Sequence, residues 1–563
     1  MDIYVKSSIM KKFIIFVAVI FLSVFALIPL FGSAYFPIHD DTQVGRVIGM
    51  SRSLLDGQFP VRWVSDLGYG YGYPLFNYYG PLPYYIGGIL VNIGFPALYA
   101  TKIMMGIGMI LAPALAFVVL TPFFGVLAAS LSSILFMYAP YHAVQLYVRG
   151  AVGELYATAF LPLIFYGLLT PLLGKIHHRS IAIGSLGIAL TILSHTIIGY
   201  VSVVLYSVWV ILYTLVSFFG KKKYIPALFS YVCQVLVGLL LSAFFWLPAV
   251  FEMGYTSVSS QISGSANFKD HFVCASQFLY SPWGFGGSIL GCVDGMSFKI
   301  GTMQLALFFY GIFIFWVHRF RPSQKSVAML VGIVLTWVAL FFMSAPSSLI
   351  WDRIVNFSYI QYPWRFLSIA TFGIAVVCGY AFSNSGSFVR RILAVLIIVL
   401  VLVVSSDEFS PQRFVARPLE AYTSKEELHF RVSKISDEYL PRDIIRPQSL
   451  SEVKSVVFQA ENSVTKDILT DRSNYLKAMI QSSVDQNITV AKTWFVGWHY
   501  FVNGNEITPR VVNGFPIIHV LRGSSMIELR LSDTPVQRVG NVISILTVVC
   551  AALLFIRYEK NNA

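Results

Sequence analysis

The sequence predicts an all-α polytopic membrane protein that also carries one hydrophilic, β-rich domain near its C-terminus. Apolar runs of membrane-spanning length recur along the 563 residues, and the mean hydropathy is +0.70. Only 12% of the residues are charged, and most Lys and Arg residues form short clusters at the ends of apolar runs. Residues 407–537 form the one large hydrophilic block, so a second structural class is expected there.

About twelve apolar segments are expected to cross the membrane, and a further segment at 82–98 is ambiguous. That segment is short, and three glycines and Pro96 interrupt it. If it lies at the interface instead of spanning, every basic cluster between the spans faces the cytoplasm, as the positive-inside rule requires. The spans are expected at approximately 13–31, 102–120, 122–138, 155–173, 180–196, 198–219, 225–250, 303–318, 327–345, 365–383, 391–406 and 540–557.

The topology that follows is that of a multi-pass plasma-membrane protein with its N-terminus in the cytoplasm. The run from Phe13 to Leu30 is long for the apolar part of a secretory signal, so it is expected to remain as the first span. The unusual polar residues then fall almost all on the outer side, and any chemistry faces outward. The cytoplasmic basic clusters are expected at Lys175 and Arg179, Lys221–Lys223, Arg319 and Arg321, and Arg390 and Arg391.

Three parts of the chain are predicted from these patterns. Residues 1–406 form the transmembrane domain, with a first external loop at 32–101. Residues 407–537 form an extracytoplasmic domain, whose second half alternates apolar and polar residues between turns at Asn503-Gly504 and Asn513-Gly514. This pattern predicts a small β-sandwich. Residues 538–563 form a closing span and a cytoplasmic tail.

Several classes of function are not supported by the sequence. The formal charge of +13 does not indicate nucleic-acid binding, because no basic stripe interleaved with aromatic residues lies on a hydrophilic domain. No Walker A loop, dinucleotide fingerprint, nucleophile elbow or zinc-type His/Cys spacing is found. The bilayer is the one partner that the composition requires.

The first candidate site opens the first external loop with His39, Asp40 and Asp41. Two adjacent carboxylates at the mouth of a membrane helix are costly to bury in lipid, and they indicate a functional site. The alternative is a solvated loop that begins with acidic residues. An amphipathic segment with Arg52 and a Gly/Tyr/Pro-rich stretch follow.

The second candidate site contains Arg149 and Glu154, near the start of the fourth span. Such a pair is either a structural ion pair or part of a site. A carboxylate near an acidic pair can hold a divalent cation, which makes Asp41 and Glu154 the candidate ligands for Mg or Mn. An arginine can hold a phosphate.

Further candidates lie at other outer ends of spans. Arg365 follows Trp364, so it is either an interfacial anchor or a phosphate ligand. His195 is either a packed, hydrogen-bonded histidine or part of a site. Cys274 and Cys292 share one external loop in an oxidising compartment, which predicts a disulfide.

Several motifs together resemble a known family of bacterial membrane proteins. They are HDDT at 39–42, YGYPLFNYYGPLPYY at 71–85, YVRGAVGE at 147–154, LSHT at 193–196, YPWRFL at 362–367 and GW at 497–498. The family is labelled "6-pyruvoyl-tetrahydropterin synthase-related" and is similar to the GT-C superfamily of lipid-linked-sugar glycosyltransferases. The label does not describe pterin chemistry here, because a pterin synthase is a soluble enzyme with a three-histidine zinc site, and this sequence has no such site.

The resemblance implies a GT-C-like fold whose first external loop carries an essential carboxylate. Asp40 and Asp41 match that carboxylate, and Glu154 occupies the place of a second acidic residue that is more commonly Asp. The implied catalytic residues are therefore Asp40, Asp41 and Glu154, with Asp40 or Asp41 as the general base.

The expected function is transfer of a sugar from a polyprenyl-phosphate donor to an extracytoplasmic glycan or protein acceptor. Arg149 or Arg365 would bind the phosphate, and His39, Arg52 and His195 complete the expected substrate-binding residues. The alternative is a non-catalytic or transport protein for lipid-linked glycans, for which ionisable residues near mid-bilayer would be typical.

Overall fold

The computed structural model describes residues 2–175, 178–219, 225–258, 266–318, 323–383 and 388–562. Contacts divide the chain into two compact units, each of which is discontinuous in sequence. The first unit is Met1–His39, Met105–Leu239 and Ile262–Ala416, and the second is Asp40–Met104, Leu240–Gln261 and Arg417–Ala563. The linear domain boundaries at 406 and 537 stay a prediction. The basic clusters expected at 221–223 and at 319–321 lie outside the described residues.

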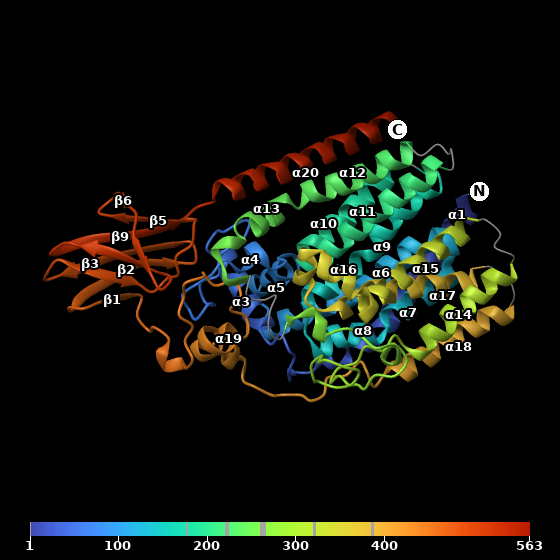
Figure 1. Cartoon of the computed structure of the whole chain (residues 1–563), viewed down its shortest axis with the longest axis horizontal. Helices are drawn as coiled ribbons and strands as arrows, with labels where there is room; N and C mark the ends of the chain where they lie inside the picture. The colour runs from blue at the N-terminus through green and yellow to red at the C-terminus, as the bar shows by residue number, and fades with distance from the viewer. Residues whose placement is uncertain are drawn as a thin grey trace. The chain divides into compact units, whose positions relative to one another are not determined.

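Among the described residues, eight helices are long and apolar enough to cross a membrane, or ten if each of two bent pairs counts as one span. The eight contain α1 (Asp2–Val24), α6 (Ala97–Phe124), α9 (Val152–Leu172), α11 (Thr196–Phe219), α15 (Gln324–Met343), α17 (Leu367–Phe382), α18 (Phe388–Ser405) and α20 (Pro535–Asn562) (Figure 1). One bent pair is α7 (Val126–Met137) with Pro140–Val148, and the other is α12 (Ile225–Leu241) with α13 (Ala243–Phe251).

Each of the twelve predicted spans coincides with a helix, but twelve membrane crossings are not confirmed. The two remaining segments form α10 (His178–Ser194) and α14 (Thr302–Val317), with 17 and 16 residues. About 20 residues are needed to cross the hydrocarbon core, because a helix rises about 1.5 Å per residue. Length and apolar composition therefore support eight to ten spans.

The ambiguous segment at 82–98 contains α5 (Leu82–Asn92), a helix of 11 residues. A helix of that length is about 16 Å long, which is too short to cross a core of about 30 Å. It packs against α3 (Gln43–Leu55), where a Cβ on Gly87 would lie 2.7 Å from Val47 Cγ2. The helix is therefore too short to span the membrane, in agreement with the prediction. Its position at the interface stays a prediction.

The first unit is centred on α17, whose residues are all buried. Helices α7, α14 and α15 pack around it, and α15 approaches so closely that a Cβ on Gly373 would lie 2.6 Å from Thr336 Oγ1. A short 3-10 segment, Pro363–Phe366, leads into α17 and holds Arg365. The central helix thus fixes the position of Arg365.

The C-terminal strands form two antiparallel sheets (orange to red in Figure 1). One sheet has the order β1-β4-β8-β7 and the other β2-β3-β9-β5-β6. The strands are β1 (Phe458–Ala460), β2 (Val464–Arg472), β3 (Tyr475–Ser482), β4 (Gln486–Val490), β5 (Trp498–Val502), β6 (Asn505–Ile507), β7 (Arg510–Val512), β8 (Phe515–Val520) and β9 (Gly523–Leu531).

The two sheets enclose one hydrophobic core, as the alternating sequence pattern predicted for a β-sandwich. Ile488 and Ile518 come from one sheet and Ile480 and Leu529 from the other, and all four are fully buried. The predicted turns at Asn503-Gly504 and Asn513-Gly514 join β5 to β6 and β7 to β8. All four turn residues have positive φ, which Asn and Gly adopt most readily.

The core of the sandwich includes Trp63, a residue of the long loop at 32–101 that is predicted to be external. Its ring lies 5.5 Å from that of Trp498 and 6.1 Å from that of Phe495. The Tyr71 carbonyl accepts a hydrogen bond from the Thr493 amide at 3.0 Å. Residues 40–104 and the sandwich therefore belong to the same compact unit, although they are far apart in the sequence.

We expect Trp63→Ala to destabilise the sandwich by about 3–5 kcal/mol, because it leaves a cavity in the core. Urea-dependent proteolysis of the full-length protein in detergent, followed at sites within 458–531, measures the change. Leu521→Ala is the control, because Leu521 is an exposed side chain of the same domain. Equal resistance of the Trp63→Ala and wild-type proteins would contradict this packing.

Candidate functional site

The first unit buries Glu154 completely, in the first turn of α9. Its Oε1 accepts hydrogen bonds from the Tyr141 hydroxyl, from Gln145 Nε2 at 3.2 Å and from Ser368 Oγ at 3.4 Å. Its Oε2 accepts from Arg149 Nη1 at 2.8 Å. A carboxylate near a helix N-terminus is favoured by the helix dipole, so the position suits a negative charge.

Arg149 follows a single wide turn of π-helix, Val144–Val148, in which the Arg149 amide bonds to the Val144 carbonyl at 2.8 Å. The chain then reverses at Gly150, whose φ is +64°. A Cβ at Gly150 would also lie 2.3 Å from Ile38 Cδ1, so two independent constraints favour glycine there. This turn separates Arg149 from α9 and lets the arginine reach back to Glu154.

Arg365 approaches the same carboxylate from the start of α17. Its Nε lies 3.8 Å from Glu154 Oε2, and its Nη1 donates to the Ile360 carbonyl at 2.5 Å and to Gln361 Oε1 at 3.1 Å. The guanidinium also lies over the Tyr362 ring, 5.0 Å from its centroid. Arg149 makes the corresponding contact with Trp364, at 4.3 Å.

The charged side chains of this cluster are two arginines and one glutamate. One carboxylate faces two guanidinium groups, and each arginine is only 7% exposed. Arginine stays protonated in proteins, so with Glu154 ionised the three side chains carry a net charge of about +1. Buried charge is costly without a counter-ion. The arrangement is therefore suited to receive an anion with oxygen acceptors.

His39 and His195, the two histidines predicted as substrate-binding residues, lie beside residues 148–153. His195 Nδ1 accepts a hydrogen bond from the Ile198 amide at 3.1 Å, and a Cβ on Gly153 would lie 3.4 Å from His195 Cδ2. The His39 amide donates to the Val148 carbonyl at 2.9 Å, and its Nε2 lies 2.8 Å from the Phe285 carbonyl oxygen. The bond from the Ile198 amide to His195 and the bond from the His39 amide to Val148 both hold the local backbone in place.

Asp40 and Asp41 belong to the second unit. Asp41 Oδ2 accepts from Arg431 Nη1 at 2.8 Å, and Arg431 also pairs with Glu427. Among the described residues, the Asp40 carboxylate has no hydrogen-bond partner, whereas its backbone carbonyl accepts from the Thr42 amide at 2.6 Å. The two neighbouring carboxylates thus differ: one is bound by an arginine and the other is open.

The surroundings of Asp41 shift two carboxyl groups in opposite directions. Burial raises the pKa of Asp41, and the charge of Arg431 opposes that rise. Burial also opposes ionisation of Glu427, but hydrogen bonds from Arg431 and Arg417 outweigh it and lower the pKa of Glu427. Glu427 therefore serves as the anionic partner that holds Arg431 against Asp41.

Arg52 and the proposed metal ligands fit their expected roles less well. Arg52, at the end of α3, pairs with Asp66 and is nearly half exposed, which is typical of a surface ion pair. Both Glu154 oxygens already accept hydrogen bonds among cationic groups, and Asp41 is bound to Arg431. No group of three or more His, Cys, Asp or Glu residues suited to a metal occurs within the described ranges. The assignment of Asp41 and Glu154 as ligands for Mg or Mn stays a prediction.

Other residues that contact Glu154 or Asp41 were not predicted from the sequence. Tyr141 and Gln145 lie one helical turn apart, in the polar stretch before Arg149, and that spacing could have identified them. Arg431 is 390 residues from Asp41, and no local signal connects them. By contrast, the predicted disulfide between Cys274 and Cys292 is confirmed, with their Cα atoms 5.5 Å apart.

The chain was also compared with models of protein families. A family described as "6-pyruvoyl-tetrahydropterin synthase related domain; membrane protein" matches residues 76–412, which is more than half of the chain. No curated protein matches the sequence.

Thirteen solved chains match the structure, and three of them illustrate the likeness. Arabinofuranosyltransferase AftD from Mycobacteria is 12% identical over 72% of this chain and 28% of its own, with a TM-score of 0.42. ArnT from Cupriavidus metallidurans, bound to undecaprenyl phosphate, is 12% identical over 76% of this chain and 78% of its own, with a TM-score of 0.35. The Archaeoglobus fulgidus oligosaccharyltransferase, in complex with Zn and sulfate, is 15% identical over 79% of this chain and 59% of its own, with a TM-score of 0.33. This chain spans less than a third of AftD, and no activity is transferred from these proteins.

We expect Glu154→Gln to lower the free energy of unfolding by about 3–5 kcal/mol, because it leaves two buried guanidinium groups without their carboxylate. Thermal denaturation of the purified protein in detergent measures the change. Adding Arg365→Gln should recover part of the loss, because it removes one of the uncompensated charges. An unchanged melting temperature for Glu154→Gln would contradict the role of this ion pair.

Proposed function

The chain belongs to the family of membrane proteins described as 6-pyruvoyl-tetrahydropterin synthase related, as its motifs predicted, and we propose that it is an integral-membrane glycosyltransferase. The proposed donor is a sugar on a polyprenyl phosphate, and the proposed acceptor is an extracytoplasmic glycan or protein. Lipid-phosphate donors suit an outward-facing site, because nucleotide sugars are absent there. The roles below are assigned to residues of each unit separately.

The observation that carries the proposal is the buried cluster of Arg149, Arg365 and Glu154, in which the Arg365 Nε makes no hydrogen bond to any described residue. A lipid-linked phosphate would supply oxygen acceptors to the guanidinium groups. Glu154 is a positioning residue in this proposal, because its oxygens are engaged in holding the arginines and their neighbours. The arginines would also stabilise the charge on the departing phosphate.

Asp40 is the proposed general base, since its carboxylate is open while that of Asp41 is held by Arg431. Asp40 accepts the proton of the acceptor hydroxyl, and the freed oxygen attacks the anomeric carbon. The bond from that carbon to the phosphate oxygen breaks, and the phosphate leaves with the electron pair. Attack opposite the leaving group inverts the anomeric configuration. No step is derived through a metal.

We expect Asp40→Asn to lower the rate of transfer by about 10²–10⁴-fold, the usual contribution of a general base. The assay follows transfer from radiolabelled polyprenyl-phosphate sugars in membranes that carry wild-type or variant protein at equal expression. Asp41→Asn should have a smaller effect, and Asp66→Asn is the control, because Asp66 belongs to a partly exposed ion pair.

Two outcomes would reject this mechanism. Full activity of Asp40→Asn would remove the proposed base. If no donor in a broad panel is consumed, the protein is not a transferase of this kind, and a non-catalytic or transport role for lipid-linked glycans becomes the leading hypothesis.

Binding of the phosphate is tested without turnover. Polyprenyl phosphate should raise the melting temperature of the wild-type protein, whereas the matching polyprenol, which lacks the phosphate, should not. Arg149→Gln or Arg365→Gln should weaken binding by at least about tenfold, since hydrogen bonds between charged groups contribute about 1.5–3 kcal/mol. Arg413→Gln is the matched control, because Arg413 is an exposed arginine of the same unit. Equal stabilisation by both lipids would show that the phosphate is not recognised.

A further inference from the structure

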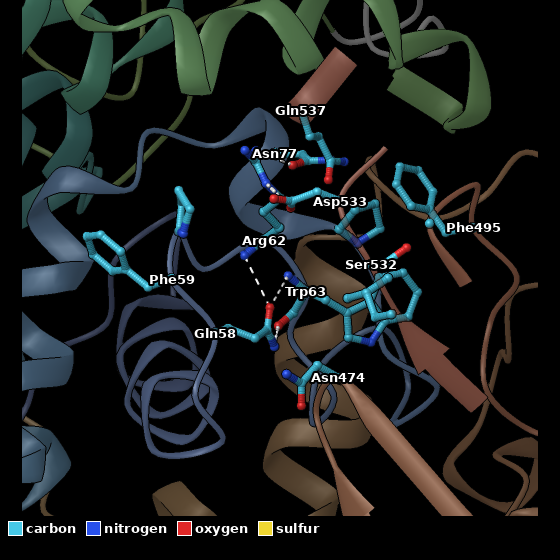
Figure 2. Close-up of a pocket in the computed structure, with 14 residues that line it drawn as sticks. Gln58, Phe59, Arg62, Trp63, Asn77, Asn474, Phe495, Ser532, Asp533 and Gln537 are labelled. Carbon is cyan, nitrogen blue, oxygen red and sulfur yellow. Dashed lines mark hydrogen bonds and ion pairs between the residues drawn. The ribbon is translucent and has the colours of Figure 1, made fainter. Parts of the chain in front are cut away.

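A cavity of about 200 Å³ lies in the second unit, where the first external loop meets the β-sandwich. Figure 2 shows its wall: Phe59 on one side, Trp63 and Phe495 on the other, and polar side chains between them. Neither the family description nor the proposed transfer chemistry gives this cavity a role. Its lining combines flat apolar rings with amide, hydroxyl and carboxylate groups.

Of the three aromatic rings that line the cavity, Phe59 is the one that is not buried in the core. Trp63 and Phe495 are buried in the core of the sandwich, so their positions are explained by packing. Phe59 is 83% exposed, and its nearest ring neighbour is Tyr85 at 6.0 Å between centroids. An exposed ring at the rim of a cavity offers a flat apolar face to a flat ligand.

Three polar groups at the cavity retain hydrogen-bonding capacity. Within the described part of the chain, the Asn474 amide and the Ser532 hydroxyl have no side-chain hydrogen-bond partner. Asp533 Oδ2 accepts from Asn541 Nδ2 at 2.8 Å, while Oδ1 has only a long contact of 3.5 Å with Arg62 Nε. Together they offer donors and acceptors in the mixture that a ligand with several hydroxyl groups requires.

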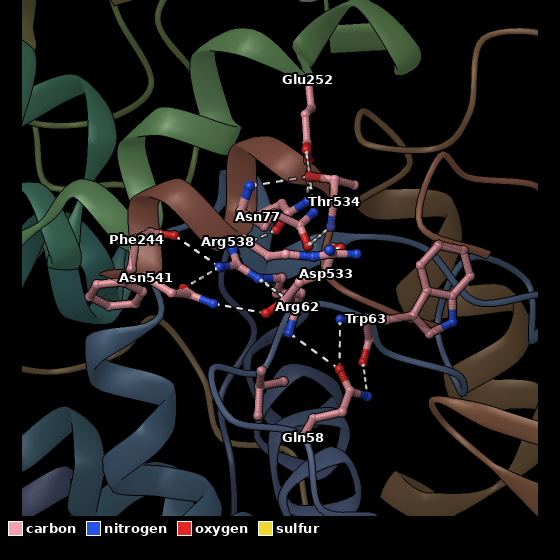
Figure 3. Close-up of polar contacts among 12 residues, drawn as sticks. Gln58, Arg62, Trp63, Asn77, Phe244, Glu252, Asp533, Thr534, Arg538 and Asn541 are labelled. Atoms are coloured by element: carbon pink, nitrogen blue, oxygen red, sulfur yellow. Dashed lines mark hydrogen bonds and ion pairs between the residues drawn. The ribbon is translucent and has the colours of Figure 1, made fainter. Parts of the chain in front are cut away.

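Arg62, the arginine of the lining, is held by hydrogen bonds from its terminal nitrogens and by an ion pair, while its Nε makes no hydrogen bond within the described ranges. Arg62 donates to Asn77 Oδ1 at 3.0 Å, to the Phe244 carbonyl at 3.1 Å and to Asn541 Oδ1 at 2.8 Å, and it pairs with Asp533 (Figure 3). Its charge is therefore compensated. The cavity is suited to a neutral ligand and not to a phosphate.

A second set of contacts keeps the wall rigid. Glu252 is buried and accepts hydrogen bonds from Asn77 Nδ2 at 3.1 Å, from Gln537 Nε2 at 2.8 Å and from the Thr534 hydroxyl. These bonds join the first loop, the end of α13 and the start of α20 (Figure 3). A preorganised wall lowers the entropic cost of binding a small ligand.

We propose that this cavity binds one neutral sugar ring of the acceptor glycan, stacked on Phe59 and hydrogen-bonded by Asn474, Ser532 and Asp533. The volume is small compared with the roughly 300–1,000 Å³ of common ligand sites, so it suits a single ring. The identification of the ligand as an acceptor rests on the proposed glycosyltransferase function. Sugar binding itself does not depend on that function.

The test is saturation-transfer NMR on the full-length protein in lipid nanodiscs, with methyl glycosides of glucose, galactose, mannose, N-acetylglucosamine and arabinofuranose. At least one glycoside should receive saturation from the wild-type protein. Phe59→Ala and Asn474→Ala should each weaken its binding by about five- to tenfold. Leu521→Ala, which removes an exposed apolar side chain of the same unit, should leave binding unchanged.

Each outcome decides the proposal. Absence of saturation transfer to every glycoside overturns it, and so does binding that Phe59→Ala and Asn474→Ala leave unchanged. Binding of a short peptide in place of the glycosides, lost in the same two variants, would assign the cavity to a protein acceptor and reject the sugar.

The experiment also separates this proposal from the proposed function. Asp40→Asn should retain glycoside binding, because the base is not part of the cavity wall. If transfer activity is found and Phe59→Ala raises KM for the acceptor without lowering kcat, both proposals hold. If transfer is found but no glycoside binds, the cavity proposal fails alone. If a glycoside binds and no donor is consumed, the transferase proposal fails alone.

Discussion

A buried carboxylate held between two arginines is the interaction on which the first unit depends. Glu154 has no exposed surface, so each of its oxygens needs a donor from the protein. The donors come from distant parts of the sequence: Arg149 from the turn before α9, and Ser368 and Arg365 from around the start of α17. Satisfying one buried charge therefore fixes how these two helices begin.

The same requirement explains the irregular backbone around the cluster. The π-helical turn before Arg149 and the positive φ of Gly150 interrupt what would otherwise be a continuous helix. Such interruptions persist in a buried region only where protein groups satisfy the freed backbone. Here the Arg149 amide bonds to the Val144 carbonyl and the Ala151 amide to the Gln145 carbonyl. The irregular backbone thus places Arg149 where its guanidinium contacts Glu154.

The second unit solves a different problem, which is how to order a long loop rich in glycine and tyrosine. Its solution is to bury Trp63 in the core of the sandwich and to bond Thr493 to the Tyr71 carbonyl. A loop held in this way can carry Asp40 and Phe59 on a defined surface. The cavity beside Phe59 exists because the loop and the sandwich are folded together.

The sequence by itself determined the class of the protein, its helices and strands, and which charged residues stand out. Hydropathy located twelve helical segments, and alternation with Asn-Gly turns located the sandwich, because both signals are local and periodic. Arg149, Glu154 and Arg365 were also recognised from sequence, since charges at the ends of apolar runs are conspicuous. Their assembly around one carboxylate was decided only by tertiary structure.

Three features could not have been read from the chain. The partner of Asp41 is 390 residues away, and the sandwich core takes Trp63 from a loop almost four hundred residues before its first strand. The fold also decided which apolar segments form short helices or bent pairs: α10 and α14 are short, and α7 and α12 each belong to a bent pair. Local patterns report how a segment can bury its own side chains, whereas a buried charge or a shared core is satisfied by whichever segment the fold brings to it.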